Sequence, residues 1–147
     1  MSNKFPKPRK WIPKNPDKYI GDVNNIITRS SWETKFLVWL DSNPSVIRWN
    51  SEEMVVPYFN PLDSKMHRYF VDFVATMKLK SGIEKTYAIE IKPLVQCLPP
   101  KPNKNRQRLL LETSTYIINQ EKWKAARKYC SDKGIEFLVL TEKDLGI

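Results

Sequence analysis

The stretches His67-Arg-Tyr-Phe-Val-Asp-Phe73 and Tyr87-Ala-Ile-Glu-Ile-Lys-Pro93 decide the fold of this chain. Both are rich in aromatic and β-branched residues, and the turn signal Lys80-Ser-Gly82 lies between them, so both are predicted to be β-strands. Because successive side chains of a strand point to opposite faces, Glu90 and Lys92 are expected to share one face of the second strand. The apolar residues that alternate with them take the other face.

Asp72 is the acidic residue of the first stretch. If the two strands pair as a hairpin, Asp72 is brought beside Glu90, and two carboxylates and Lys92 converge on one polar patch of the sheet. Two carboxylates can hold a magnesium ion, and an adjacent lysine can stabilise a charged reaction centre. The alternative is structural: Asp72 pairs with Arg68, and Glu90 and Lys92 form a surface ion pair of little energetic value.

An acid-x-Lys triplet is by itself a weak signal, because the chain contains three of them. Glu33-Thr-Lys35 falls in a predicted helix, where residues two apart do not face each other. Asp63-Ser-Lys65 falls in a loop after Pro61. Only Glu90-Ile-Lys92 lies on a predicted strand. It is therefore the strand, and not the triplet alone, that makes these residues candidates for a site.

The composition favours a polyanionic partner. The chain has 147 residues, with 25 lysines and arginines against 16 aspartates and glutamates, and a formal net charge of +9. Nucleic acid is the first candidate for such a basic protein, and a purely solubilising charge is the alternative. Two cysteines and one histidine make a zinc site or a disulfide framework improbable. No apolar run approaches the roughly 18 residues of a membrane-spanning helix, and a reduced, cytosolic protein is expected.

The chain is predicted to divide into an arm and one domain. Residues 1–20 are basic and rich in proline, which blocks helices and sheet ladders, so an extended arm is expected. Such an arm can lie along a phosphate backbone, contact a protein partner or remain a disordered tail. Residues 21–147 are sufficient for a single domain with a hydrophobic core.

The pattern within the domain predicts a mixed α/β fold. A helix begins at Ser30 or Ser31, with the capping-box spacing to Glu33, and carries an apolar stripe that includes Trp39. Three strands follow, and the order α, β, β, β, α, α, β predicts a mixed central β-sheet flanked by helices. The remaining predicted elements are a first strand over residues 46–59, a helix over 105–133 in two pieces broken near 118–120, and a last strand over 135–140.

Taken together, these residues resemble the PD-(D/E)XK nuclease superfamily, with Glu33 on a helix, Asp72 on a strand and Glu90-Ile-Lys92 on the next strand. Arg29-Ser-Ser-Trp-Glu33, Arg68-Tyr-Phe-Val-Asp-Phe73 and the tail over residues 122–142 are similar to its transposon-end endonuclease branch. The resemblance covers about residues 28–144 and extends to the head-completion nucleases of T-even-like tailed phages. Val71 departs from the proline of the superfamily name, at a position that carries no chemistry.

The resemblance implies a restriction-endonuclease-like core and a DNA endonuclease that depends on Mg²⁺ or Mn²⁺. In this pattern Asp72 and Glu90 ligate the metal, and Lys92 orients the attacking water or steadies the phosphate. Glu33 is an accessory acid that contacts the metal directly or through water. The implied role is hydrolysis of phosphodiester bonds in phage head completion, which trims or stabilises packaged DNA ends before tail joining. Head, portal or neck proteins would be partners, in the host cytoplasm during assembly or in the virion.

Two other functions stay open. The first is a non-catalytic virion assembly protein that grips DNA or the portal on this fold. The second is a basic RNA-binding protein, against which the lack of an aromatic ribonucleoprotein motif speaks. Candidate nucleic-acid contacts are Arg29 and Ser30, through a helix N-terminus, and a basic run whose alternative is a solvated loop. That run consists of Lys101, Lys104, Arg106 and Arg108.

Overall fold

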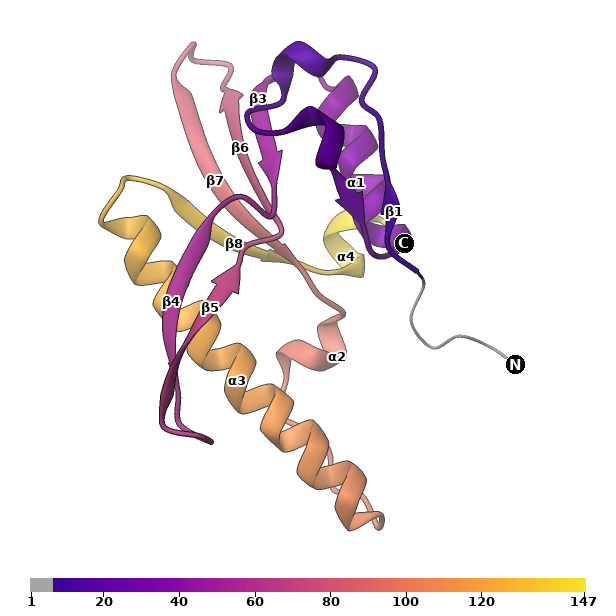
Figure 1. Cartoon of the computed structure of the whole chain (residues 1–147), viewed down its shortest axis with the longest axis vertical. Coiled ribbons are helices and arrows are strands. Elements are labelled where there is room, and N and C mark those ends of the chain that lie inside the picture. The colour runs from indigo at the N-terminus through magenta and orange to yellow at the C-terminus, as the bar shows by residue number, and fades with distance from the viewer. Residues whose placement is uncertain (1–6) are drawn as a thin grey trace.

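A four-stranded mixed β-sheet forms the centre of the computed structural model, which describes residues 7–147 (Figure 1). In spatial order its strands are β3 (Val46–Ser51), β6 (Phe73–Lys78), β7 (Glu84–Ile91) and β8 (Glu136–Leu140). β3, β6 and β7 are antiparallel neighbours, whereas β8 runs parallel to β7. The predicted mixed sheet is therefore confirmed. The helices between β7 and β8 supply the long connection that a parallel pair requires.

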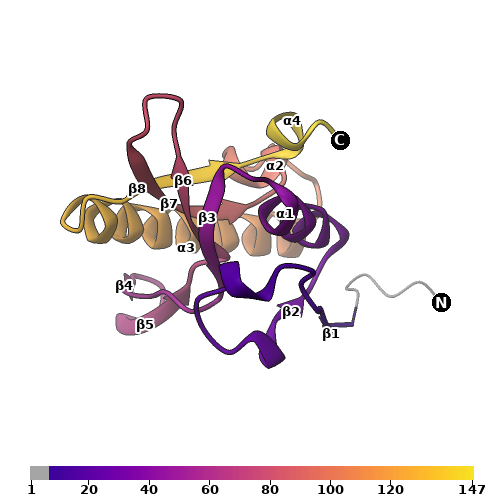
Figure 2. The ribbon, with the colours of Figure 1, turned by 90° about the horizontal axis from the view of Figure 1, so that it is seen from above.

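Helices cover both faces of this sheet, as the view in Figure 2 shows. α1 (Ser31–Ser42) and the short α4 (Glu142–Leu145) pack on one face, and α3 (Arg106–Ser131) packs on the other. Among the residues that the structure describes, no helix is both long enough and apolar enough to cross a membrane. The flanking helices thus match the predicted α/β architecture.

Alternate side chains of β7 lie in two separate hydrophobic cores, one on each face of the sheet. Ile89 and Ile91 lie in the core on the α1 side, together with Leu37. Ala88 lies in the core on the α3 side, where it is joined by Trp123. Because both faces of the last four residues of β7 are covered, a polar side chain there has to find its partners inside the protein.

An N-terminal strap, residues 9–28, runs over α1 and β3. The backbone amides of Lys14 and Asn15 donate to the carboxylate of Asp41 at 2.9 and 3.1 Å, and Lys18 Nζ donates to three carbonyls at the end of α1. The strap therefore satisfies the free carbonyls of that helix end. Of the predicted arm, residues 1–6 lie outside the described residues. The elements of the strap are β1 (Arg9–Lys10), two short 3₁₀ turns (Pro16–Lys18 and Val23–Asn25) and β2 (Ile27–Thr28).

The strands around Asp72 differ from the prediction. The stretch predicted as one strand over residues 67–73 is interrupted, because β5 (Lys65–Phe70) ends before Asp72 and β6 begins after it. The hairpin partner of β7 is β6, whereas β5 pairs with β4 (Val55–Asn60) in a separate two-stranded sheet. The first strand, predicted over residues 46–59, is likewise two strands, β3 and β4, in different sheets. Backbone hydrogen bonds between residues 52–54 and 71–72 hold the two breaks side by side.

Two further expectations about the helices are wrong. α3 is one continuous helix rather than two pieces, because the predicted break at Asn119 falls on the face that packs against the sheet, where Asn119 is buried. Trp39, assigned to the core, is 43% exposed and stacks on Phe36 at the edge of α1. A short helix α2 (Leu94–Cys97) follows β7 and was not predicted.

Candidate active site

Asp72 lies in the bend that joins the two-stranded β4–β5 sheet to the central sheet, beside the end of β7. Its Oδ2 accepts a hydrogen bond from the backbone amide of Ile91 at 2.9 Å, and its carbonyl accepts one from the amide of Glu52 at 3.1 Å. Glu52 has a left-handed backbone conformation with φ of 55°, which is uncommon for a residue other than glycine. The carboxylate of Asp72 is therefore fixed beside β7 from two directions, although Asp72 is not in the strand that was predicted.

Glu90 occupies the α3 face of β7, as the alternation predicts. Its side chain is only 5% exposed, and Trp123 Nε1 donates to Glu90 Oε2 at 3.3 Å. A buried carboxylate with one neutral donor is poorly compensated, because the Trp123 indole brings no positive charge. Glu90 thus remains an acceptor with unused capacity.

The two carboxylates face each other closely enough to compete for a proton. Burial raises the pKa of Asp72 well above its usual range, and the negative charge of Glu90 raises it further. Two like charges in a buried site cannot both stay ionised without a compensating positive charge. Within residues 7–147 neither carboxylate forms an ion pair with a lysine or arginine, so a proton or a bound cation is the direct way to compensate them.

This pair predicts an inverted pH dependence of stability in the metal-free protein. Because the pKa of Asp72 is raised in the folded state, the folded protein holds this proton more tightly than the unfolded chain does. The contribution of Asp72 to the free energy of unfolding therefore rises as the pH falls from neutral through the raised pKa towards about 4. Thermal melts in EDTA should show the wild type gaining stability relative to Asp72→Asn between about pH 8 and about pH 5. A difference that does not change with pH would contradict the raised pKa.

Lys92 follows β7, and its backbone amide donates to the carbonyl of Leu140 at 2.9 Å, which continues the ladder with β8. A second lysine, Lys122 on α3, was not predicted as a site residue. Burial lowers the pKa of Lys122, the charges of Glu90 and Asp72 oppose this effect, and the charge of Lys92 adds to it. Both lysines therefore share the electrostatic environment of the carboxylate pair.

Two tyrosines explain why sequence patterns missed Lys122. Its ammonium lies 5.8 Å from the ring centre of Tyr58 and 5.6 Å from that of Tyr69, where cation–π attraction holds it. These tyrosines come from β4 and β5, which only the tertiary fold brings to α3. Among the sequence signals, only its helical spacing places Lys122 near this face, since it lies three residues after Asn119 and four before Ala126, both of which are buried.

Glu33 lies in the first turn of α1, close to the pair but with its own partners. Ser30 caps the helix by accepting from the amide of Glu33 at 3.1 Å, and the Ser30 hydroxyl donates to Glu33 Oε2 at 3.0 Å. Burial raises the pKa of Glu33, and the charges of Glu52 and Glu90 are among the further causes. The charge of Glu90 therefore affects the pKa of Glu33, while the Glu33 carboxylate is hydrogen-bonded to the Ser30 hydroxyl at the helix cap.

The chemistry of the donors fits one magnesium ion held by two carboxylates. Within residues 7–147, no three acidic, histidine or cysteine side chains are grouped closely enough to ligate an ion together, so Asp72 and Glu90 are the carboxylates that lie next to each other, with Glu33 nearby. The hydroxyl of Tyr69 is buried in this region without a hydrogen-bond partner. Magnesium usually keeps several waters and takes one or two carboxylates. A hydrated cation would compensate the acids and give the Tyr69 hydroxyl a partner.

The one histidine of the chain and the predicted basic run lie elsewhere. His67 is on β5, where its ring stacks on Tyr58 and Nε2 bonds Asp63 Oδ2 at 2.6 Å. The basic run predicted near residue 100 lies at the outer end of α3, which extends beyond the sheet in Figure 1. All buried residues of α3 lie from Asn119 onwards, so this end does not pack on the domain. The run consists of Lys101, Lys104, Arg106 and Arg108, the last of which pairs with Glu112 at 2.8 Å.

Comparisons with known proteins show the family to which this chain belongs. The chain is 45% identical over 141 residues to a protein of Enterobacteria phage T4 named head completion nuclease, which covers 92% of this chain and 91% of that protein. No solved structure matches the chain. The model of the family described as TnsA-like endonuclease N terminal matches residues 43–142, a span that includes Asp72, Glu90 and Lys92 but not Glu33. The chain belongs to the TnsA-like endonuclease family.

Proposed function

We propose that this protein is a metal-dependent DNA endonuclease of phage head completion. It hydrolyses phosphodiester bonds and trims or stabilises packaged DNA ends before the tail joins. The observation that carries the proposal is the buried Asp72–Glu90 pair near Lys92 and Lys122, because in the part of the chain that the structure describes neither carboxylate forms an ion pair with a basic side chain. The family supports cleavage, and the name of the phage T4 relative supports the stage of assembly.

Each residue has a distinct task in this proposal. A bound Mg²⁺ or Mn²⁺ would supply Lewis acidity at the phosphate and a water of lowered pKa. Asp72 and Glu90 hold the ion, and Trp123 fixes the orientation of Glu90 through its indole N–H. Lys92 steadies the negative charge that develops on the phosphate or orients the attacking water. Glu33 acts as an accessory acid that contacts the metal directly or through a water molecule.

The substrate, partners and location that we propose are based on the resemblance to the head completion nuclease of phage T4. DNA is the substrate, and head, portal or neck proteins are the partners that bring the enzyme to DNA ends. The work takes place in the host cytoplasm during assembly, and the protein can remain in the virion. A positive net charge of +9 favours association with DNA through release of counterions.

Divalent cations are expected to stabilise the folded protein and to switch on cleavage. At neutral pH the melting temperature should rise on adding Mg²⁺ or Mn²⁺, because the ion replaces the repulsion between Asp72 and Glu90. In parallel, supercoiled plasmid should be cut with Mg²⁺ and left intact with EDTA. Glu112→Gln is a suitable control, because Glu112 is at the outer end of α3, where it pairs with Arg108 at 2.8 Å.

The two readouts separate this proposal from its alternative. A cation-dependent melting shift without any cleavage of DNA would favour the non-catalytic assembly protein on the same fold. The absence of both, under conditions where the protein binds DNA, would remove the metal site from the proposal.

A further inference from the structure

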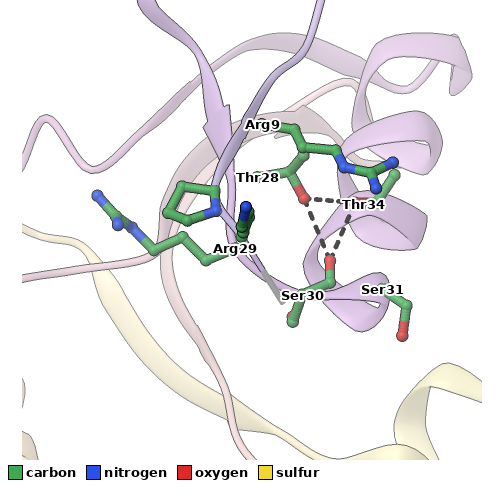
Figure 3. Close-up of a pocket in the computed structure, with 8 residues that line it drawn as sticks. Arg9, Thr28, Arg29, Ser30, Ser31 and Thr34 are labelled. Atoms are coloured by element: carbon green, nitrogen blue, oxygen red, sulfur yellow. Dashed lines mark hydrogen bonds between the residues drawn. The ribbon is translucent and has the colours of Figure 1, made fainter. Parts of the chain in front are cut away.

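A cavity of about 720 Å³ opens between the N-terminal strap and the start of α1 (Figure 3). It is separate from the Asp72–Glu90 pair, since neither residue lines it. The residues that line it are Lys7, Pro8, Arg9, Thr28, Arg29, Ser30, Ser31 and Thr34. We call it the strap pocket.

The strap pocket is strongly cationic. Three of its eight lining residues are basic, and none of these eight is acidic. Arg29 is paired with Glu52, with 2.9 Å between Nε and Oε1. Within the described part of the chain, Lys7 and Arg9 make no ion pair, so their charge is available to a ligand. Three cations around one cavity, only one of them paired, select an anion.

The walls of the strap pocket are held in place by hydrogen bonds. Arg9 stands opposite Thr28 in the β1–β2 ladder, and the amide of Trp11 donates to the carbonyl of Ile26 at 2.8 Å just beyond it. The hydroxyls of Thr28 and Thr34 both bond the carbonyl of Ser30, at 3.1 and 2.9 Å, as Figure 3 shows. Arg9 is therefore placed by a paired strand rather than by a loose arm, which lowers the entropic cost of binding.

The strap pocket reaches the catalytic carboxylates through Arg29. Arg29 bonds the side chain of Glu52, whose backbone amide bonds the carbonyl of Asp72 at 3.1 Å. In Figure 3 the side chains of Arg9 and Arg29 extend in opposite directions, Arg9 over Thr34 and Arg29 away from it. A chain of phosphates that enters over Arg9 would thus be led past Arg29 towards Asp72.

We propose that the strap pocket binds a phosphate group of the DNA strand that is cut, at a position other than the scissile phosphate. The inference rests on the proposed function for its substrate and adds a second anchoring point on the same strand. Arg9 and Lys7 bind this phosphate directly, and Arg29 continues the contact towards the carboxylate pair. The group is either a phosphodiester of the backbone or a terminal phosphomonoester, which share the chemistry recognised here.

The test compares Arg9→Gln with Lys10→Gln. The two residues are adjacent on β1 and lose the same charge, but only Arg9 lines the pocket. Binding of a fluorescent duplex is measured in EDTA by anisotropy across a salt series, in the Asp72→Asn background so that no strand is cut. Arg9→Gln is expected to weaken binding about tenfold and to reduce the salt slope by about one, whereas Lys10→Gln changes affinity by less than about threefold.

A second set of binding measurements distinguishes a terminal phosphate from a backbone phosphate. Duplexes with and without 5′ and 3′ terminal phosphates are compared. A loss in Arg9→Gln that disappears without the terminal phosphate assigns a monoester, and a loss that persists assigns a backbone diester. Equal losses of affinity in Arg9→Gln and Lys10→Gln, or no loss in either, would contradict the proposal that the strap pocket binds phosphate. Because binding is read without cleavage, this result is independent of whether the wild type cuts DNA.

Discussion

Replacing Asp72 with asparagine is expected to abolish DNA cleavage and, at the same time, to stabilise the metal-free protein. The rate should fall by about a thousandfold or more, because one of two metal-holding carboxylates is lost. The amide oxygen of asparagine can still accept from the Ile91 amide, so the fold keeps this bond. Removing one of two like charges should raise the melting temperature in EDTA by about 3 °C at neutral pH.

The opposite signs of the two effects make this test informative. Asp132→Asn is a matched control, because Asp132 is an exposed acid at the end of α3 and its loss should change neither readout. If Asp72→Asn still cuts DNA at the wild-type rate, Asp72 is not catalytic. A melting temperature that falls would show that the Asp72 carboxylate is compensated in the folded protein by something other than a metal.

Replacing Lys92 with methionine is expected to remove cleavage while leaving metal binding and DNA binding intact. Methionine keeps most of the length and apolar stem of lysine but removes the charge that steadies the phosphate, so the rate should fall by about a hundredfold to a thousandfold. The backbone bond from Lys92 to Leu140 does not depend on the side chain, which protects β7 and β8 from the change. The magnesium-dependent rise in melting temperature should be unaltered.

Lys124→Met provides the matched control for Lys92→Met, since Lys124 is an exposed lysine of α3. It loses the same charge from the molecule as a whole and should keep full activity. Equal cleavage rates for the two variants would show that Lys92 acts only through the net charge of the protein. Loss of the magnesium-dependent melting shift in Lys92→Met would instead place Lys92 in the folding of the metal site.

Local patterns were sufficient to predict the faces of β7 but not the position of Asp72. The alternation of Glu90 and Ile91 is a property of one strand, and burial on both faces preserves it. The sequence around the bend at Asp72 contains no glycine or proline that would predict a bend. It is set by bonds to residues 52–54, which are distant in sequence, so the run of aromatic and β-branched residues was extended through it.

Tertiary burial explains the other differences. Residues 118–120 have weak helix propensity, which predicts a break, but packing of Asn119 and Trp123 on the sheet outweighs a few tenths of a kcal/mol per residue. Lys122 becomes part of the site only because Tyr58 and Tyr69 lie beneath it. The strap pocket depends on pairing of Arg9 with Thr28, and no periodicity in the sequence records that pairing.

The parallel pairing of β7 with β8 sets the order in which the parts of this site can assemble during folding. β6 and β7 are joined by a short turn, so closing their hairpin costs little loop entropy and brings Asp72 beside Glu90 early. Tyr87 must instead find Glu136 across the whole of α3, a long-range contact that forms slowly. The backbone of Lys92 is fixed only by this late contact with Leu140. We therefore expect the two acids to meet before Lys92 is positioned, so that a competent site forms only once β8 has paired with β7.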